Sequence, residues 1–269
     1  MKVRVLVLAG NGINCEYETA YAFRQAGAEP EIVYLYDLLW GTKDLRDYHI
    51  LCFPGGFLDG DDLGAARACA HRFRYARIKG GERLWDHLME FIRQGGLILG
   101  ICNGFQLLVK MGLIPALEGD YGRQQASFTF NDSGRFEDRW VWLKVNPSSP
   151  CVFTQGLEGL YLPVRHGEGK FVTADHRLLE ELLKNGQVVL QYADPDYNPT
   201  MQYPFNPNGS EGAIAGVCDP TGRIFGLMPH PEAFLHFTNH PRWRREPPSE
   251  VLGVELFRRG VEYVRKNIL

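Results

Sequence analysis

One cysteine has the surroundings of a catalytic nucleophile. Cys102 lies between Gly100 and Gly104 in LILGICNGFQLL (97–108), after an apolar run and before a helical pattern. A nucleophile on a sharp strand-to-helix turn needs small neighbours, because flanking side chains would collide with the strained backbone. The free N–H groups at the start of the helix favour the thiolate. The pattern predicts a thiol that attacks carbonyl carbon; the alternative is a buried structural cysteine whose neighbouring glycines serve packing.

A histidine and a carboxylate follow late in the chain. His230 and Glu232 lie in GLMPHPE (226–232). Pro231 biases His230 towards an extended conformation, and side chains at i and i+2 of an extended chain point the same way. Glu232 is therefore expected to orient the imidazole and to stabilise its protonated form. We predict a Cys102–His230–Glu232 triad.

Thiolate attack on a carbonyl creates an oxyanion, which needs fixed hydrogen-bond donors. Gly55 and Gly56 in LCFPGGF (51–57) follow an apolar run, so either glycine can turn its N–H towards the site. The N–H of Asn103, the residue after the nucleophile, is the expected second donor. The sequence leaves the choice between the two glycines open.

The other histidines are less informative. His166 in RHGEGKF follows an apolar strand, which suggests backbone lining a pocket, or equally a simple turn. His236 and His240 have i, i+4 spacing, but no third ligand is evident, so we predict no metal site. Four more are interpreted as structural: His49, His71, His87 and His176.

Composition indicates a single folded domain over residues 1–269. Hydrophobic residues make up 45% and charged residues 23% of the 269-residue chain, which is ordinary globular usage. The formal charge is −3, from 29 Lys+Arg against 32 Asp+Glu, so no strong positive field attracts a polyanion. We therefore expect no nucleic-acid partner.

Cysteine usage indicates a reducing compartment. The six cysteines contain no C-x-x-C pair, which argues against a disulfide framework or a zinc ribbon and favours the cytoplasm. The opening run 3–8 alternates with basic Lys2 and Arg4, so it predicts a strand and not a signal peptide. No stretch approaches the roughly 18 apolar residues of a membrane span. We expect no membrane partner.

The elements that must position these residues fall into two groups. The first half alternates strands with helices, which predicts a parallel sheet covered by helices on both faces. The apolar strand at 97–101 has no polar face and should be central. The expected strands are 3–8, 32–35, 49–53 and 97–101, and the expected helices are 16–25 and 84–93.

The second half predicts antiparallel strands added to this sheet, so the fold class is α/β with a mostly parallel centre. Asp219-Pro220-Thr221-Gly222 should turn the last two strands into a hairpin. A closing helix is expected at 249–267, with Ser249 as its N-cap. The other expected elements are strands at 140–145, 160–172, 188–194, 213–219 and 223–232 and a helix at 176–184.

Three stretches are predicted as long loops: 58–81, 195–209 and 233–248. Loops of this length usually carry function or contact a partner. For each stretch, a mobile surface loop without a function is an equally weighted alternative. In an open α/β sheet, ligands bind at the carboxyl ends of the strands. Cys102 follows a predicted strand and His230 lies at the end of one, so we expect both at that edge.

Together these motifs resemble the class I (triad) glutamine amidotransferases, which have a flavodoxin-like fold. The resemblance is closer to one branch, the glutaminase subunit of phosphoribosylformylglycinamidine synthase. The motifs run in order across nearly the whole chain: GNGINCE (10–16), LCFPGGF (51–57), GDDL (60–63), GICNGFQLL (100–108), VRHGEGKF (164–171), NGSEGAIAGV (208–217) and GLMPHPE (226–232).

The resemblance implies that glutamine is hydrolysed at Cys102 through a γ-glutamyl thioester. The ammonia passes to a synthetase subunit, which uses ATP and magnesium to convert formylglycinamide ribonucleotide to its amidine; no cofactor is expected in this chain, and a small third subunit is expected in the complex. By the same resemblance, His230 is the general base and then the acid, and Glu232 orients it. The remaining implied site residues are Gly55 or Gly56 with Asn103 for the oxyanion, and Gln106 with the His166-Gly167 backbone for glutamine.

The chain departs from the short form of that subunit. Residues 233–248 intervene after H-P-E, residues 65–83 are longer and basic, and Leu58-Asp59 replaces Ser-Tyr. These differences concern the partner geometry and leave the triad intact. Three alternatives remain: a glutaminase subunit for another amidotransferase, a cysteine hydrolase of the peptidase or deglycase type, which would lack Glu232 in an H-P-E motif, and an idle subunit that only binds a partner.

Overall fold

The computed structural model describes residues 2–248 and 250–269, and a nine-stranded mixed sheet forms its centre. The strand order is β2-β1-β3-β4-β11-β10-β9-β6-β7. Five neighbouring strands are parallel: β2 (Glu29–Tyr34), β1 (Arg4–Ala9), β3 (Ile50–Phe53), β4 (Leu97–Ile101) and β11 (Ile224–Leu227). The rest are antiparallel to their neighbours: β10 (Ile214–Cys218), β9 (Val188–Ala193), β6 (Glu137–Val145) and β7 (Gly159–His166).

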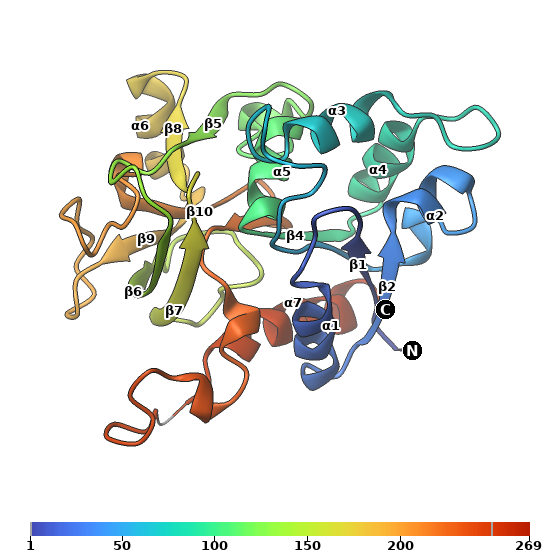
Figure 1. The fold of residues 1–269 in the computed structure, drawn as a ribbon. Helices are drawn as coiled ribbons and strands as arrows, with labels where there is room; N and C mark the ends of the chain where they lie inside the picture. The colour runs from blue at the N-terminus through green and yellow to red at the C-terminus, as the bar shows by residue number, and fades with distance from the viewer. Residues whose placement is uncertain (1, 249) are drawn as a thin grey trace.

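Helices cover both faces of the parallel half (Figure 1). One face carries α3 (Arg67–Tyr75), α4 (Leu84–Arg93) and α5 (Asn103–Met111), and the other carries α1 (Glu16–Gln25) and α7 (Gly253–Asn267). A second, two-stranded sheet pairs β5 (Ala126–Thr129) with β8 (Lys170–Thr173), and α6 (His176–Lys184) contacts β8. The short α2 (Leu35–Trp40) follows β2 directly. The expected α/β class with added antiparallel strands is confirmed.

The sheet brings the ends of β4 and β11 together. All five residues of β4 are buried, as its lack of a polar face predicts for a strand between β3 and β11. The predicted hairpin of β10 and β11 is confirmed, and the Gly222 N–H donates to the Asp219 carbonyl at 3.0 Å. At the carboxyl edge, the Cys102 N–H donates to the Leu227 carbonyl at 2.8 Å. The two motifs therefore leave the sheet side by side.

The loop predicted at 58–81 is wrong in its second part, because that part contains α3. Small side chains conceal the helical pattern: Cys69, Ala70 and Phe73 form the buried face, and arginines occupy half of the remaining positions. The helix is only nine residues long. Its amphipathic signal is therefore weak in the sequence.

Several predicted boundaries are also wrong. The strand expected at 160–172 is two strands in different sheets, β7 and β8, which separate at Gly167-Glu168-Gly169. The strand expected at 223–232 ends at Leu227, and the closing helix begins at Gly253. Ser249, its predicted N-cap, lies outside the described residues.

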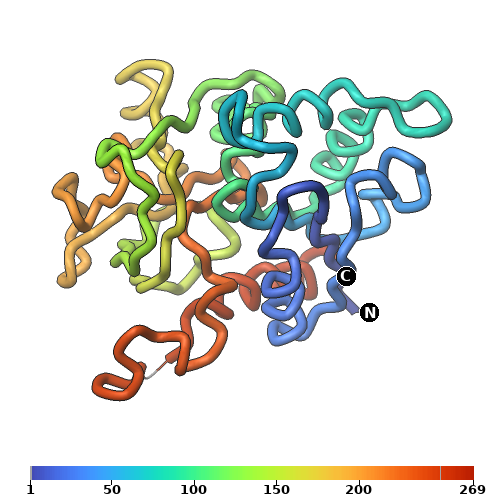
Figure 2. The backbone as a smooth tube through the Cα atoms, in the orientation of Figure 1, coloured from blue at the N-terminus to red at the C-terminus, as the bar shows by residue number. Residues whose placement is uncertain are grey.

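The other two predicted loops are confirmed as irregular. Residues 195–209 contain one isolated bridge, at Pro199, and 234–248 contain a single 3-10 turn, Phe237–Asn239. The second segment projects from the body of the molecule (Figure 2). No helix among the described residues combines the length and the apolar composition needed to cross a bilayer.

Candidate active site

Cys102 lies on a strained turn between β4 and α5. Its φ of 50° and ψ of −103° are unfavourable for a side chain larger than glycine, and such strain persists only where the surroundings impose it. A Cβ at Gly104 would lie 1.8 Å from the Phe53 carbonyl oxygen, and one at Gly100 would lie 2.7 Å from the Gly104 carbonyl oxygen. The two glycines therefore let α5 pack directly on the sheet, as the strand-turn-helix pattern predicts.

The Cys102 thiol points into a small cavity at the start of α5. The residue is 6% exposed, and its Sγ lies 3.7 Å from the Arg165 carbonyl oxygen on β7, which accepts its hydrogen bond. The N–H groups at the start of a helix lack intrahelical acceptors and carry partial positive charge, which stabilises a thiolate placed there.

His230 and Glu232 form a buried pair beside this cavity. His230 Nδ1 lies 2.5 Å from Glu232 Oε1, and each residue is 3% exposed. His230 has φ −106° and ψ 88°, which is outside the helical region but short of the extended conformation expected before Pro231. Glu232, however, lies in the 3-10 turn Pro231–Ala233, so the argument from an extended chain is wrong for this residue. The turn brings the carboxylate to the imidazole instead.

The charges around His230 favour its protonated form. Burial by itself lowers the pKa of His230, but the Glu232 carboxylate and the neighbouring Cys102 side chain raise it more, so that the net pKa lies well above the ordinary value. Nε2, the ring nitrogen away from Glu232, is buried and has no hydrogen-bond partner in the described chain. An imidazolium with a free N–H can stabilise a thiolate and donate a proton.

A cavity of about 300 Å³ joins the predicted residues. This is the lower end of the range for small-molecule sites, roughly 300–1,000 Å³, and suits a ligand as small as an amino acid. Seven of the nine predicted site residues line it: Cys102, His230, Glu232, Gly56, Gln106, His166 and Gly167.

The two candidate glycines occupy different places. Gly56 lines the cavity with a φ of +145°, and a Cβ there would lie 2.5 Å from the Gly12 carbonyl oxygen. Gly55 packs on the histidine, because a Cβ there would lie 2.7 Å from His230 Cε1. Asn103 is the first residue of α5, so its N–H has no acceptor within the helix.

Gln106 connects α5 to the loop after β7. Its Nε2 donates to the Glu168 carbonyl at 2.6 Å, and its Oε1 accepts from Asn103 Nδ2 at 3.1 Å. The Asn103 Oδ1 in turn accepts from the Leu58 N–H at 3.1 Å. These bonds fix the part of the cavity wall that is formed by the start of α5 and the loop after β7.

The His166 ring belongs to a buried network under the same loop. Its Nδ1 lies 3.1 Å from Asn131 Oδ1, and the residue is 3% exposed. Burial and the nearby charge of His230 lower the pKa of His166 to about 3, so the ring is neutral. The polar residues that the sequence placed between glycines therefore line a pocket, while the His166 ring itself supports the backbone.

Sequence reasoning missed the residues that hold this loop. Asn131 Nδ2 donates to the His166 carbonyl at 2.7 Å, and Asn131 Oδ1 accepts from the Gly169 N–H at 2.9 Å. Ser210 Oγ accepts from the Phe171 N–H at 2.9 Å, and Asn208 Oδ1 accepts from the Ser210 hydroxyl at 2.7 Å. The signal was the NGS motif at 208–210, to which no role was assigned.

Cys15 was also missed. Its Sγ, a ring nitrogen of His230 and a carboxylate oxygen of Glu232 all lie within 4.8 Å of one another, and among the described residues this is the group of side chains that could hold a metal ion. Burial raises the pKa of Cys15, so its thiol is a poor nucleophile. The signal was GNGINCE, which follows β1 at the carboxyl edge. His236 and His240 are not members of this group, and His236 Nδ1 contacts Thr238 Oγ1 at 2.8 Å.

The class of protein follows from where the thiol and the imidazole meet. A cysteine on a tight bend at the carboxyl edge of a parallel sheet, beside a histidine–glutamate pair that follows the adjacent strand, is the arrangement that nucleophilic attack by a thiol needs. Residues 2–264 match the family described as CobB/CobQ-like glutamine amidotransferase domain.

Related sequences and one related structure assign the chain to one branch of this family. The chain is 44% identical over 275 residues to phosphoribosylformylglycinamidine synthase subunit PurQ of Methanococcus maripaludis, covering 98% of each chain. It is 46% identical over 266 residues to PurQ of Dehalococcoides mccartyi, covering 98% of this chain and 99% of the relative. A chain of the PurLQS structure from Thermotoga maritima superposes with a TM-score of 0.71 at 30% identity, covering 98% of this chain and all of that one. The chain belongs to the CobB/CobQ-like glutamine amidotransferase family and, within it, to the PurQ subunits.

Proposed function

We propose that this chain is the glutaminase subunit of phosphoribosylformylglycinamidine synthase in purine biosynthesis. It hydrolyses glutamine to glutamate and ammonia, and the ammonia is used to convert formylglycinamide ribonucleotide to formylglycinamidine ribonucleotide. One observation carries the chemistry: Cys102, on its strained turn, and the His230–Glu232 pair line the same cavity.

The first half of the reaction forms a thioester. The Cys102 thiolate attacks the side-chain amide carbon of glutamine, and the N–H groups of Gly56 and Asn103 stabilise the oxyanion. His230, whose pKa is raised, already carries a proton, which it donates to the leaving nitrogen. The carbon–nitrogen bond breaks, ammonia leaves, and the γ-glutamyl group stays on sulfur.

The second half regenerates the enzyme. Neutral His230 removes a proton from a water molecule, which attacks the thioester carbonyl, and glutamate leaves as the carbon–sulfur bond breaks. The imidazolium and thiolate are restored together, so the net reaction adds one water to glutamine. Glu232 holds Nδ1–H throughout and keeps Nε2 facing the sulfur.

The cavity wall supplies groups that suit an amino-acid substrate. Gln106 and the backbone of His166 and Gly167 hold the glutamine side chain in this proposal, with Gln106 acting through its bond to the loop. Arg165 lies at the same cavity and is cationic, which suits the α-carboxylate, while the carboxylate of Glu18 suits the α-amino group.

The ammonia is consumed by other subunits. We propose that the whole chain acts as one domain in a cytoplasmic complex with a synthetase subunit, which binds ATP and magnesium, and with a small third subunit. The PurLQS assembly of the solved relative supports such a complex.

The test uses the reconstituted complex. Cys102→Ala should abolish glutamine-dependent amidation, by at least about a thousandfold, and should leave amidation with added ammonium intact. Cys69→Ala, which removes a buried thiol outside the cavity, is the matched control and should keep both activities. Glutamine use by the Cys102→Ala complex would show that the triad assignment is wrong.

The isolated chain should show little glutaminase activity, because such sites are commonly completed by partner-induced closure. A complex that uses glutamine but does not amidate formylglycinamide ribonucleotide would instead indicate a subunit of another amidotransferase.

A further inference from the structure

Three side chains able to bind a metal converge in the active site, and the proposed mechanism uses only two of them. Cys15 Sγ, a ring nitrogen of His230 and a carboxylate oxygen of Glu232 lie within 4.8 Å of one another, and Cys102 is not a member of this group. Cys15 precedes α1 in the loop after β1, so the chain places this thiol beside the pair independently of the triad. The thiol therefore has a fixed place in the site and no role in the reaction.

The thiol faces the Nδ1 edge of the imidazole. A Cβ at Gly55 would lie 3.3 Å from Cys15 Sγ and 3.4 Å from His230 Nδ1, so both atoms approach the same point of the backbone. Nδ1 is also the nitrogen that lies 2.5 Å from Glu232 Oε1. A sulfur, a nitrogen and an oxygen donor therefore meet at one edge of the ring.

The spacing of these donors suits a zinc ion after a small adjustment. Zinc binds sulfur at about 2.3 Å and nitrogen or oxygen at about 2.0–2.2 Å, so two ligands of a tetrahedral ion lie roughly 3.3–3.6 Å apart. The three donors already lie within 4.8 Å. The short His230–Glu232 contact lengthens when a metal replaces the proton between the two groups. All three residues line the cavity, which gives the ion a path of entry and leaves its fourth position to water.

The surroundings also favour a cation. Glu232 Oε2 is buried and has no hydrogen-bond partner in the part of the chain that the structure describes. A buried carboxylate oxygen without a donor is costly, and a bound cation removes this cost. Carboxylates outnumber guanidinium groups by four to one in the cavity lining, which attracts cations: Glu18, Asp61, Glu168 and Glu232 against Arg165.

We propose that Cys15, His230 and Glu232 form an inhibitory site for a borderline-soft divalent cation, Zn²⁺ being the type case. The thiol and the imidazolium each release a proton to solvent as they become ligands, and the thiolate and the carboxylate together neutralise the two charges of the ion. Thiolate and imidazole ligands select zinc, whereas magnesium prefers oxygen ligands, so the magnesium used by a synthetase does not compete.

A bound ion stops catalysis without binding the nucleophile. When Nδ1 is a metal ligand, the imidazole loses both its hydrogen bond to Glu232 and its extra proton. The ring then neither stabilises the Cys102 thiolate nor donates a proton to the leaving nitrogen. This consequence rests on the proposed function, whereas metal binding itself does not.

The first test measures binding and requires no glutamine. Cobalt(II) is the probe, because a cobalt–thiolate bond absorbs in the near ultraviolet and added Zn²⁺ removes this absorption by displacing the cobalt. The wild-type full-length chain should show the band, and Cys15→Ala should abolish it. The Kd for Zn²⁺, from competition with cobalt, should rise at least about a hundredfold in Cys15→Ala. Glu232→Gln, which keeps the side-chain volume, should also raise this Kd.

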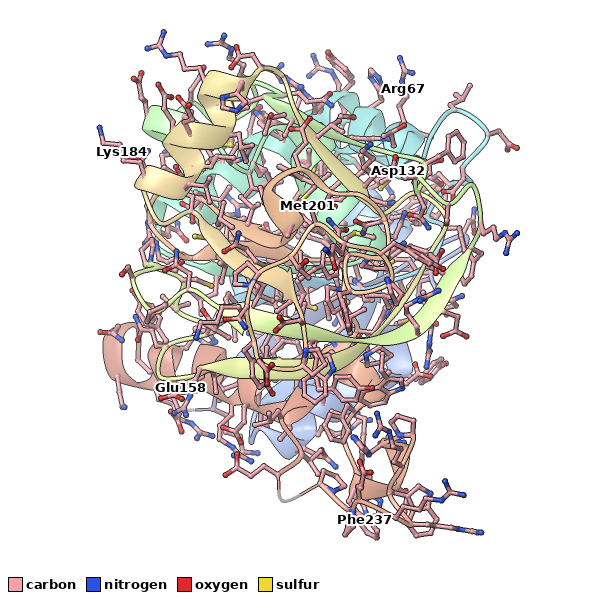
Figure 3. All side chains as sticks on the ribbon, turned by 90° about the vertical axis from the view of Figure 1, so that its left-hand side faces the viewer. Arg67, Asp132, Glu158, Lys184, Met201 and Phe237 are labelled. Atoms are coloured by element: carbon pink, nitrogen blue, oxygen red, sulfur yellow. The ribbon has the colours of Figure 1, made fainter. Side chains whose placement is uncertain are left out.

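Two controls separate this site from its competitors. Cys102→Ala removes the other thiol of the cavity and should retain the cobalt–thiolate band. His236→Ala/His240→Ala removes the histidine pair of the projecting segment, on which Figure 3 labels Phe237, and should also retain it. The inference is overturned if Cys15→Ala keeps the band, if either control loses it, or if the wild type lacks it.

The second test measures inhibition in the reconstituted complex. Zn²⁺ should inhibit glutamine-dependent amidation, and the zinc concentration that halves each complex's own zinc-free rate should be at least about tenfold higher for Cys15→Ala than for wild type. Ammonium-dependent amidation at the same zinc concentrations corrects for inhibition of the synthetase. Equal midpoints in the two complexes would show that the site is not inhibitory. A wild-type complex that cannot use glutamine would refute the proposed function instead, and the cobalt band would still decide whether the metal site exists.

Discussion

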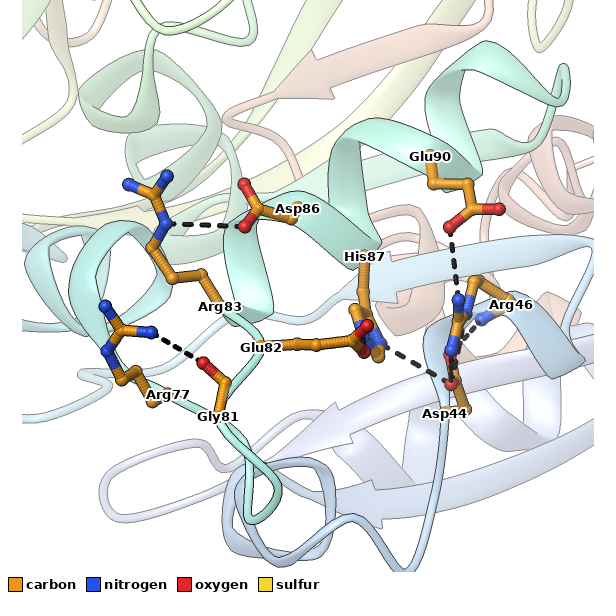
Figure 4. A network of polar contacts seen from close by, with 9 residues as sticks. All are labelled: Asp44, Arg46, Arg77, Gly81, Glu82, Arg83, Asp86, His87 and Glu90. Carbon is orange, nitrogen blue, oxygen red and sulfur yellow. Dashed lines mark hydrogen bonds and ion pairs between the residues drawn. The ribbon is translucent and has the colours of Figure 1, made fainter.

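Two buried histidines in this molecule each contact a carboxylate, and only one of them faces a nucleophile. His230 Nδ1 lies 2.5 Å from Glu232, and His87 Nε2 lies 2.6 Å from Glu82 (Figure 4). The carboxylates differ sharply in exposure, because the Glu232 side chain is 2% exposed and the Glu82 side chain is 71% exposed. A short histidine–carboxylate contact is therefore insufficient to define a site.

The surroundings decide the role of each pair. His87 Nδ1 also lies 3.4 Å from Asp44, which is itself paired with Arg46, so this histidine belongs to a network of polar contacts with partly exposed side chains (Figure 4). His230 lies instead beside a thiol and an open cavity. Catalysis in this chain therefore requires three features in one place: a desolvated carboxylate, a strained nucleophile and space for a substrate.

The largest expected difference is in catalysis. Glu232→Gln should lower kcat/KM for glutamine about a thousandfold in the complex, because the imidazole loses the anion that orients it and stabilises its charge. Glu82→Gln should change it less than about twofold, since a contact with an exposed carboxylate outside the cavity contributes little. Rates of glutamate release measure both. Equal decreases in kcat/KM in the two variants would show that the Glu232 and Glu82 carboxylates do not differ in their role.

The next difference is in pH dependence. Glu232 raises the pKa of His230, so the imidazolium that stabilises the Cys102 thiolate persists at higher pH than an ordinary histidine allows. Removing the carboxylate lowers that pKa, and the alkaline limb of Cys102 labelling by a glutamine-like electrophile should move to lower pH in Glu232→Gln. Mass spectrometry of labelled Cys102 measures the profile, and Glu82→Gln should leave it unchanged.

A second variant separates the histidine from the helix terminus as activator of the thiol. His230→Asn should slow thioester formation strongly, because the imidazole no longer supplies charge or a proton. Full labelling of Cys102 at neutral pH in this variant would show that the start of α5 alone activates the sulfur.

A third buried histidine, His166, should affect the pH dependence of the free energy of unfolding. The pKa of His166 is about 3 in the folded chain, because of burial and the charge of His230, whereas an unfolded histidine titrates near 6.5. Below about pH 6.5 the unfolded state therefore binds a proton that the folded state does not. As the pH is lowered further, the free energy of unfolding decreases by up to about 1.4 kcal/mol per pH unit. Urea denaturation of wild type and His166→Gln should reveal this slope as their difference, and parallel pH curves would contradict it.

The smallest expected effect is at Glu82. Glu82→Ala should change the free energy of unfolding by less than about 1 kcal/mol, because solvent screens its interaction with His87. Urea denaturation at neutral pH measures this difference. A decrease in the free energy of unfolding several times larger would mean that the exposed carboxylate stabilises the fold as much as a buried one does.

Much of the parallel sheet and of the cavity could be predicted from the sequence. The all-apolar β4, the two glycines around Cys102 and the H-P-E motif are signals between residues close in the chain. The prediction was wrong where small or mixed side chains blurred the periodicity, as in α3, and where a turn replaced an extended chain, as at Glu232. Such details depend on contacts with distant segments, which local patterns do not contain.

By itself the sequence determined the chemistry of the parts: a thiol confined to a tight turn by small neighbours, a histidine two residues from a glutamate, and strands apolar enough to be central. Only the tertiary structure decided that Gly56 and not Gly55 lines the cavity and that Cys15 lies against His230. The physical reason is that bond geometry and burial preference act locally, whereas strand order sets which loops meet at the edge of the sheet.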